Sequence, residues 1–392
     1  MKIGIVAGEA SGDLLGSSLI KALRAYYPEL QFAGIAGPRM EGCGARSWYP
    51  MEKLAVRGYV EVLKSYREIL SIRNQLIQGF LVDPPDVFIG IDAPDFNLAL
   101  ETALKKNGIP TIHYVSPSIW AWRGERINKI AKAASKVLTL FPFEAPIYQK
   151  AGIPVDYVGH PLADSIPDIP NRVAAREQIR LSHDRPVIAL LPGSRQTELD
   201  YHADLFIETA REILKVVPEA QFVVPLTSRE TRKQFESALY RQAALQLPIK
   251  VLFGHAQLAL TAADVALVAS GTATLETALL KCPMVITYRM SGLTYRIMKR
   301  QGYLPYVGLP NILAGEFIVP EFLQDDATPK NLARSLVNLL KHETIRKRMV
   351  TRFADIHHSL KMDNDARVVE AILPFLKHNH AQSQRNLTSA RA

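Results

Sequence analysis

An aspartate at the end of a buried apolar run is the first candidate for chemistry in this sequence. Residues 87–91 are VFIGI, a pattern that predicts a strand covered on both faces, and Asp92 follows at its carboxyl end. Ala93-Pro94 ends the strand, and Asp95 is the predicted N-cap of a helix over 96–106. Ligands of open α/β sheets bind outside the carboxyl ends of strands, so Asp92 is a catalytic candidate; alternatively, it only shapes the turn.

Three further loops carry residues suited to anion binding. Gly8-Glu9-Ala10-Ser11-Gly12 separates a strand from a helix, but it matches neither G-x-G-x-x-G nor a Walker loop and could be a tight turn only. Leu191–Arg195 sets backbone N–H groups beside a cation. Ser270-Gly271-Thr272 opens a helix in which Glu276 follows, close enough to reach a sugar hydroxyl; ordinary capping is the alternative. Asn311 lies in another strand-to-helix connection and is uninformative by itself.

A long amphipathic segment covers residues 59–77. Its apolar positions are Val62, Leu63, Tyr66, Ile69, Leu70, Leu76 and Ile77, with Lys64, Arg67 and Arg73 between them. Such a stripe usually packs into a core. The alternative is a surface helix that dips into a bilayer while its basic residues meet lipid phosphates.

The elements that position these loops alternate between short apolar runs and helical patterns. This alternation predicts parallel sheets with right-handed crossovers, in an α/β fold. Around 159–170 the composition shifts to Pro and Asp and the helical pattern stops, after which a second α/β half begins. We therefore expect domains at 1–164 and 165–345, C-terminal helices at 346–378 and a disordered tail at 379–392.

The whole chain has 392 residues, of which 48% are hydrophobic, and this length suits two domains. The net charge of +9 favours anionic ligands or an anionic bilayer; nucleic acid ranks lowest because no RNP-like motif, zinc finger or long basic run is present. Cys43 and Cys282 lack metal-ligand spacing, which favours reduced thiols in a cytoplasmic protein. The sequence has no signal-peptide pattern and no stretch of the roughly 20 apolar residues that span a membrane.

Six motifs, taken together, resemble the lipid-A-disaccharide synthase family of inverting GT-B glycosyltransferases. They are VAGEASGD at 6–13, GIDAPDFN at 90–97, HYVSPSIWAWR at 113–123, LPGSR at 191–195, SGTATLE at 270–276 and LPNILAG at 309–315. The resemblance covers nearly the whole chain in the family's order and spacing. It implies two Rossmann-like domains that face across a cleft, with C-terminal helices that pack back or are swapped in a dimer.

The resemblance also implies the reaction. UDP-2,3-diacylglucosamine would transfer its sugar to 2,3-diacylglucosamine 1-phosphate, giving a β-1,6-linked lipid A disaccharide 1-phosphate and UDP, without cofactor or metal. A UDP-sugar 2-epimerase of related two-domain fold is the alternative. We expect a peripheral protein on the cytoplasmic face of the inner membrane, and a homodimer that exchanges C-terminal segments.

The residues that the resemblance and the loops assign fall into three sets. Asp92 is the expected general base. The expected substrate- and UDP-binding residues are Glu9, Ser11, Gly12, Arg195, Ser270, Gly271, Thr272, Glu276 and Asn311. The expected membrane contacts are Val60, Val62, Leu63, Tyr66, Arg67, Ile69 and Leu70.

Overall fold

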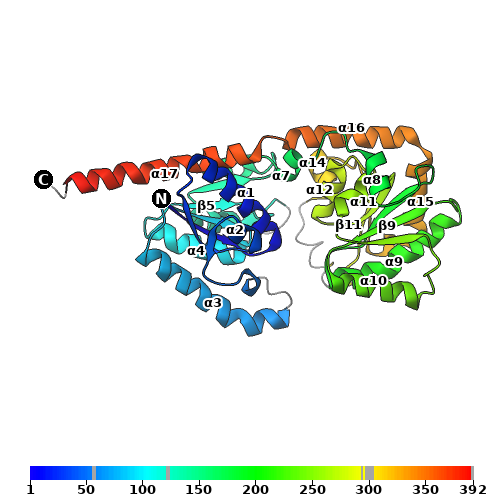
Figure 1. The fold of residues 1–392 in the computed structure, drawn as a ribbon, viewed down its shortest axis with the longest axis horizontal. Coiled ribbons are helices and arrows are strands. Elements are labelled where there is room, and N and C mark those ends of the chain that lie inside the picture. The colour runs from blue at the N-terminus through cyan, green and yellow to red at the C-terminus, as the bar shows by residue number, and fades with distance from the viewer. Residues whose placement is uncertain (55–58, 121–123, 293–294, 296–303, 390–392) are drawn as a thin grey trace. The chain divides into compact units, whose positions relative to one another are not determined.

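The computed structural model describes the chain except for residues 55–58, 121–123, 293–294, 296–303 and 390–392; the side chains of 59–66 and 377–389 are also outside the described part. The chain forms two compact units (Figure 1). The first consists of Met1–Asp164 together with Leu360–Ala392, and the second of Ser165–Ser359. The C-terminal segment thus returns to the unit in which the chain begins.

The first unit is built around a parallel sheet of seven strands in the order β3-β2-β1-β4-β5-β6-β7. The strands are β1 Lys2–Ala7, β2 Gln31–Ile35, β3 Ala45–Ser47, β4 Val87–Ile91, β5 Thr111–Tyr114, β6 Lys136–Thr139 and β7 Val155–Tyr157. The central strands β1 and β4 are apolar and almost wholly buried, as strands with helices on both faces must be. The chain order reverses between β1 and β4, which places the switch point of the sheet there.

Helices join these strands. They are α1 Ala10–Tyr26, α2 Pro38–Gly42, α3 Tyr59–Val82, α4 Pro94–Lys106, α5 Ile127–Ala133, α6 Ala145–Lys150 and α7 Pro161–Ser165. The prediction that Asp95 caps α4 is wrong. Ala93 occupies the N-cap position in a left-handed conformation, and Asp95 lies in the first turn, where it pairs with Arg126 at 2.6 Å.

The last helix, α17 Asn364–Ser389, completes the core of the first unit. It packs against α1, and Val368, Ile372 and Leu376 belong to the same buried cluster as the central strands (Figure 1). Asp363 begins this helix as its N-cap, because its carboxylate accepts a hydrogen bond from the Ala366 N–H. The helix is described to Ser389, and the disordered tail expected from 379 stays a prediction.

The second unit repeats the architecture with six parallel strands in the order β10-β9-β8-β11-β12-β13. The strands are β8 Val187–Leu191, β9 Gln221–Leu226, β10 Ile249–Phe253, β11 Val265–Ala269, β12 Met284–Tyr288 and β13 Glu321–Leu323. The helices are α8 Arg172–Gln178, α9 Gln196–Leu214, α10 Arg229–Arg241, α11 Ala256–Ala262, α12 Thr272–Leu279, α14 Leu309–Ala314, α15 Pro329–Lys341 and α16 Glu343–Leu360. Here the chain order reverses between β8 and β11, so the loops after these two strands flank the switch point.

Candidate functional site

The turn after β4 holds Asp92 in an unusual backbone conformation. Asp92 and Ala93 both have positive φ, at 51° and 44°. The Asp92 N–H donates to the Tyr114 carbonyl at 2.9 Å, and the Asn97 amide donates to the Asp92 carbonyl at 2.8 Å. Positive φ in non-glycine residues costs free energy and persists only where the surroundings enforce it. The turn is therefore rigid, and it presents a carboxylate at the switch point of the sheet.

The turn after β1 lies directly beside the Asp92 turn. A Cβ atom added to Gly8 would come within 2.8 Å of the Ala93 Cβ, so only glycine allows this approach. Glu9 follows at the N-cap position of α1, and its charge acts on Asp92. Ser11 is exposed in the first turn of α1. Gly12 is buried instead. A Cβ there would touch Ala7 and Ile91, so glycine allows the helix to pack closely on the sheet.

The Asp92 carboxyl is half-buried and its pKa is raised. Burial is the main cause, and the negative charge of Glu9 acts in the same direction. The hydrogen bond from the Ala93 backbone and the charge of His113 oppose this rise. A carboxylate with a raised pKa is a stronger base once it is ionised, which suits proton abstraction.

A buried polar pair lies beneath this turn, and sequence reasoning missed it. His113 on β5 and Glu101 on α4 are both wholly buried, and Nδ1 of His113 lies 2.7 Å from Oε1 of Glu101. The pair sits over Gly90, whose position leaves no room for a side chain: a Cβ there would come within 2.1 Å of Glu101 Oε1. The HYVSPS motif contains this histidine. Glu101 becomes its partner because the register of β4 against β5 sets His113 beside Gly90, over which Glu101 lies.

A second buried network supports the loop after β5. Val115 has φ of 78°, which is a strained value for a β-branched residue. The hydroxyls of Ser116 and Tyr148 lie 2.7 Å apart, and Glu144 accepts hydrogen bonds from the Trp120 indole and the Phe141 N–H, each at 3.0 Å. Burial raises the pKa of Glu144 to about 7. These contacts fix the first part of the loop after β5, from Val115 to Trp120.

In the second unit, the loop after β8 presents a cation. The N–H groups of Ser194 and Arg195 donate to the Glu198 carboxylate at 2.8 and 3.2 Å, and Gly193 has φ of 128°. The Arg195 side chain is exposed. His202 holds this loop from below, because it bonds the Pro192 carbonyl at 3.0 Å. The geometry leaves the guanidinium available for an anion.

The N-terminus of α12 follows β11 at the other side of the same switch point. Gly271 is the N-cap residue with φ of 152°, and no side chain caps the helix. Thr272 is exposed in the first turn, while the Ser270 hydroxyl donates to the Val307 carbonyl at 3.4 Å. Uncapped N–H groups at a helix N-terminus favour an anion. Arg195 and this helix therefore offer two elements of an anion site at neighbouring strand ends.

Glu276 faces a surface pocket of the second unit. Its carboxylate accepts a hydrogen bond from the Gln257 amide at 3.0 Å, and both residues line the pocket together with Asn171, His255 and Thr261. Burial raises the pKa of Glu276. A carboxylate held in this way can accept hydrogen bonds from ligand hydroxyls.

Asn311, one of the expected substrate- and UDP-binding residues, lies in the first turn of α14. It is wholly buried, and its amide donates to the Val319 carbonyl at 2.9 Å and to the Glu321 carboxylate at 2.8 Å. Its oxygen accepts from the N–H groups of Ile318 and Val319, both at 2.9 Å. All of its hydrogen-bonding capacity is thus used inside the protein. Asn311 holds the start of α14 in place and has no free polar atom for a ligand.

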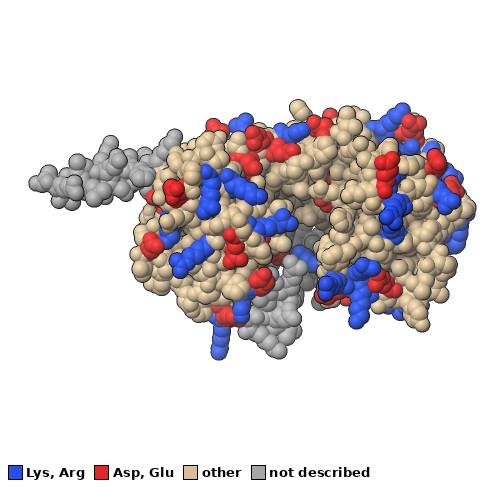
Figure 2. Space-filling view, in the orientation of Figure 1, with Lys and Arg blue, Asp and Glu red and all other residues tan. Residues whose placement is uncertain are grey.

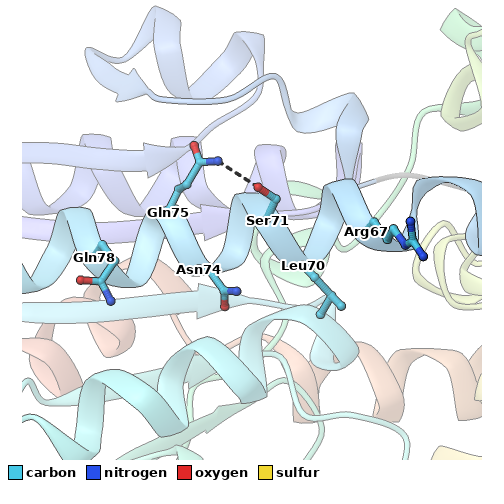
Figure 3. Close-up of a pocket in the computed structure, with 6 residues that line it drawn as sticks. All are labelled: Arg67, Leu70, Ser71, Asn74, Gln75 and Gln78. Atoms are coloured by element: carbon cyan, nitrogen blue, oxygen red, sulfur yellow. Dashed lines mark hydrogen bonds between the residues drawn. The ribbon is translucent and has the colours of Figure 1, made fainter.

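Helix α3 divides into a core face and an outer face. Ile72, Leu76 and Phe80 are buried in the core of the first unit, and Ile69 packs against them. Ile69, one of the expected membrane contacts, is therefore half-buried. The outer face carries Arg67 and Leu70, followed by the polar residues Ser71, Asn74, Gln75 and Gln78, which together line a surface pocket (Figure 3). Val60, Val62, Leu63 and Tyr66 have side chains outside the described part of the chain.

No helix among the described residues is long and apolar enough to cross a membrane. No group of three or more His, Cys, Asp or Glu side chains among them is arranged to hold a metal ion.

Solved structures share the two-unit fold. The UDP-GlcNAc 2-epimerase of Neisseria meningitidis, bound to UDP-GlcNAc, matches with a TM-score of 0.64 at 14% identity, covering 95% of this chain and 99% of its own. The calicheamicin glycosyltransferase CalG4 matches with a TM-score of 0.60 at 12% identity, covering 96% and 98%. At these identities the matches establish the fold, which is the expected GT-B architecture, and nothing further.

Sequence relatives are much closer. The lipid-A-disaccharide synthase of Chromobacterium violaceum is 57% identical over 373 residues, which cover 95% of this chain and 97% of that protein. The enzyme of the same name from Methylobacillus flagellatus is 56% identical over 375 residues, covering 96% and 99%. The family model described as lipid-A-disaccharide synthetase matches residues 3–372. The chain therefore belongs to the lipid-A-disaccharide synthetase family.

Proposed function

We propose that this protein condenses UDP-2,3-diacylglucosamine with 2,3-diacylglucosamine 1-phosphate, using Asp92 as the general base. Membership of the lipid-A-disaccharide synthetase family supports the reaction. The observation that carries the role of Asp92 is its placement: a half-buried carboxylate on a strained, hydrogen-bonded turn at the switch point of the first sheet. A fixed carboxylate at that position suits proton transfer better than one on a mobile loop.

The proposed step is a single displacement with inversion. Asp92 removes the proton from the acceptor 6-hydroxyl, and the hydroxyl oxygen attacks the anomeric carbon of the UDP-sugar. The new carbon–oxygen bond forms while the bond to the UDP β-phosphate breaks, and the electron pair of that bond leaves with UDP. The products are the β-1,6-linked disaccharide 1-phosphate and UDP, and the proton resides on Asp92.

The second unit supplies residues suited to UDP. The exposed Arg195 guanidinium and the uncapped N-terminus of α12 can stabilise the negative charge that develops on the leaving diphosphate. Glu276, held by Gln257, is suited to accept a hydrogen bond from a sugar hydroxyl. Ser270, Gly271 and Thr272 contribute through the position of their backbone, and Asn311 contributes indirectly by fixing α14.

We further propose that the N-terminal half of α3 meets an anionic membrane, which would place the protein on the cytoplasmic face of the inner membrane. The net charge of +9 and the exposed Arg67 beside Leu70 support this contact. On the face drawn in Figure 2, basic and acidic side chains are interspersed, so attraction to lipid there would be local. The polar outer face from Ser71 to Gln78 limits the contact to the first turns of the helix.

The homodimer with exchanged C-terminal segments stays a prediction. In this structure α17 packs against α1 of its own chain, and the apolar face of that helix is suited to fill the same place in a second copy. Light scattering coupled to size-exclusion chromatography would measure the mass in solution.

Incubation of the purified protein with both diacylglucosamine substrates tests the proposed reaction. We expect mass spectrometry to detect the disaccharide 1-phosphate and an equal amount of UDP, formed only when both substrates are present. Conversion of the UDP-sugar to a 2-epimer without acceptor would contradict the proposal, because a transferase needs the second substrate.

A further inference from the structure

The buried pair of Glu101 and His113 is the strongest feature that the proposed mechanism leaves unused. Both side chains are wholly buried, and they lie 2.7 Å apart. Nε2 of His113 and Oε2 of Glu101 are buried without a hydrogen-bond partner among the described residues. Ionisable groups are rarely placed in a core without a use, because burial of their charges costs free energy.

The pair favours a charged imidazole. Burial alone would lower the pKa of His113, but the charge of Glu101, its hydrogen bond, and the charge of Asp92 outweigh burial, so the pKa of His113 is raised. A carboxylate beside the ring favours the imidazolium in the same way. The imidazolium therefore has Glu101 as its hydrogen-bond partner, and Asp92 acts on it through its charge.

The sheet register places His113 beside Gly90, two residues before the base. Gly90 pairs with His113 and Ile91 pairs with Tyr114, so the strand that carries the histidine runs beside the strand that ends at Asp92. The Asp92 N–H is itself bonded to the carbonyl of Tyr114, the residue after His113. Two charged groups of the described residues act on Asp92 in opposite directions, namely His113 on β5 and Glu9 at the start of α1.

We propose that His113, held as an imidazolium by Glu101, is a positioning residue that keeps the Asp92 carboxylate ionised in a site where burial and Glu9 favour its protonation. This inference rests on the proposed role of Asp92 as the base. His113 acts on the base through its charge and not on the substrate, and it transfers no proton in the reaction. Its contribution is the electrostatic balance that lets a half-buried acid act as a base near neutral pH.

The pH dependence of kcat/KM tests the proposal. Activity requires ionised Asp92, so it falls as the pH drops through the pKa of that carboxyl. Removing the positive charge of His113 raises this pKa, so the acid limb moves to higher pH. We expect Glu101→Gln and His113→Gln each to move the limb upward by about one pH unit or more. Activity should recover at a pH well above the limb.

His160→Asn is the matched control. This histidine also belongs to the first unit, but its pKa is lowered to about 4, chiefly by burial, and it stacks on Phe141 away from the Glu101–His113 pair. Any loss in this variant should be the same at every pH. An acid limb of the Glu101 and His113 variants that coincides with that of the wild type would overturn the proposal, as would a loss that is equal at all pH values.

A second measurement does not depend on activity. In the wild-type protein labelled with ¹⁵N-histidine, the ring signals of His113 should be those of a doubly protonated imidazole at pH 6.5, where an ordinary histidine is half titrated. The signals that disappear in His113→Gln identify the residue. A neutral ring at that pH would overturn the proposal even if the enzyme is active. Absence of disaccharide formation by the wild type would instead refute the proposed reaction.

Discussion

Replacement of Asn311 by alanine tests whether this residue supports the fold or binds a ligand. The side chain makes four hydrogen bonds of 2.8 to 2.9 Å, to Ile318, Val319 (twice) and Glu321. At about 1 kcal/mol for each bond, Asn311→Ala should lower the free energy of unfolding of the second unit by about 4 kcal/mol. For a unit of this size the midpoint of thermal unfolding should fall by roughly 10 °C.

Calorimetric unfolding measures the loss of stability. Titration with UDP, at a temperature where the variant is folded, measures its affinity for UDP. We expect UDP affinity to change by less than about threefold under those conditions, because no polar atom of Asn311 is free. Asn331→Ala is the control: its side chain makes a single exposed hydrogen bond to the Asp326 carbonyl, so the loss should stay below about 1 kcal/mol. Wild-type stability with loss of UDP binding in Asn311→Ala would refute the reasoning.

Two further predictions concern the ligand surfaces. Arg195→Met should weaken UDP binding in calorimetry by roughly 10- to 100-fold, since one charge-assisted hydrogen bond contributes about 1.5–3 kcal/mol; unchanged affinity would exclude the guanidinium from the UDP site. Leu63→Ser with Leu70→Ser should reduce co-sedimentation with anionic liposomes while activity on detergent-dispersed substrates is kept. Gln78→Ser, farther along the same outer face of α3, is the control. If the double variant sediments as much as Gln78→Ser does, the first turns of α3 do not contact the membrane.

Buried apolar runs made the strands predictable. The strand expected at 87–91 has those bounds in the structure, because it is apolar and covered on both faces. The short edge strands β3 and β13 escaped prediction. Each has three residues, and no residue of β13 is fully buried. Neither sequence can be distinguished from the sequence of a loop.

Local conformation was harder to predict than element order. Asp95 has the residue type of an N-cap, but Ala93 takes that position because the turn after β4 is left-handed at both Asp92 and Ala93. Alanine gives no signal for such a conformation, since its backbone is enforced by tertiary hydrogen bonds. Helix α1 likewise begins at Ala10, although its glycine-containing start resembled a longer turn.

The candidate site was partly predictable for the same reasons. Asp92, Glu9 and Arg195 follow strand ends, so their positions at switch points follow from the alternation of strands and helices. The Glu101–His113 pair joins helix α4 to strand β5. The contact depends on the register of β4 against β5, which no spacing in the sequence shows. Asn311 lies in a family motif, but only its contacts distinguish support of a loop from contact with a ligand.

The rate of disaccharide formation by Asp92→Asn tests the central claim most directly. Asparagine tolerates positive φ and has the size of aspartate, so the turn should keep its shape. We predict a loss of about 10²- to 10⁴-fold in kcat with unchanged affinity for UDP, because only the base is removed. Asp95→Asn, which neutralises the exposed neighbouring carboxylate paired with Arg126, should stay within a few-fold of the wild type. Wild-type activity in Asp92→Asn would contradict the account.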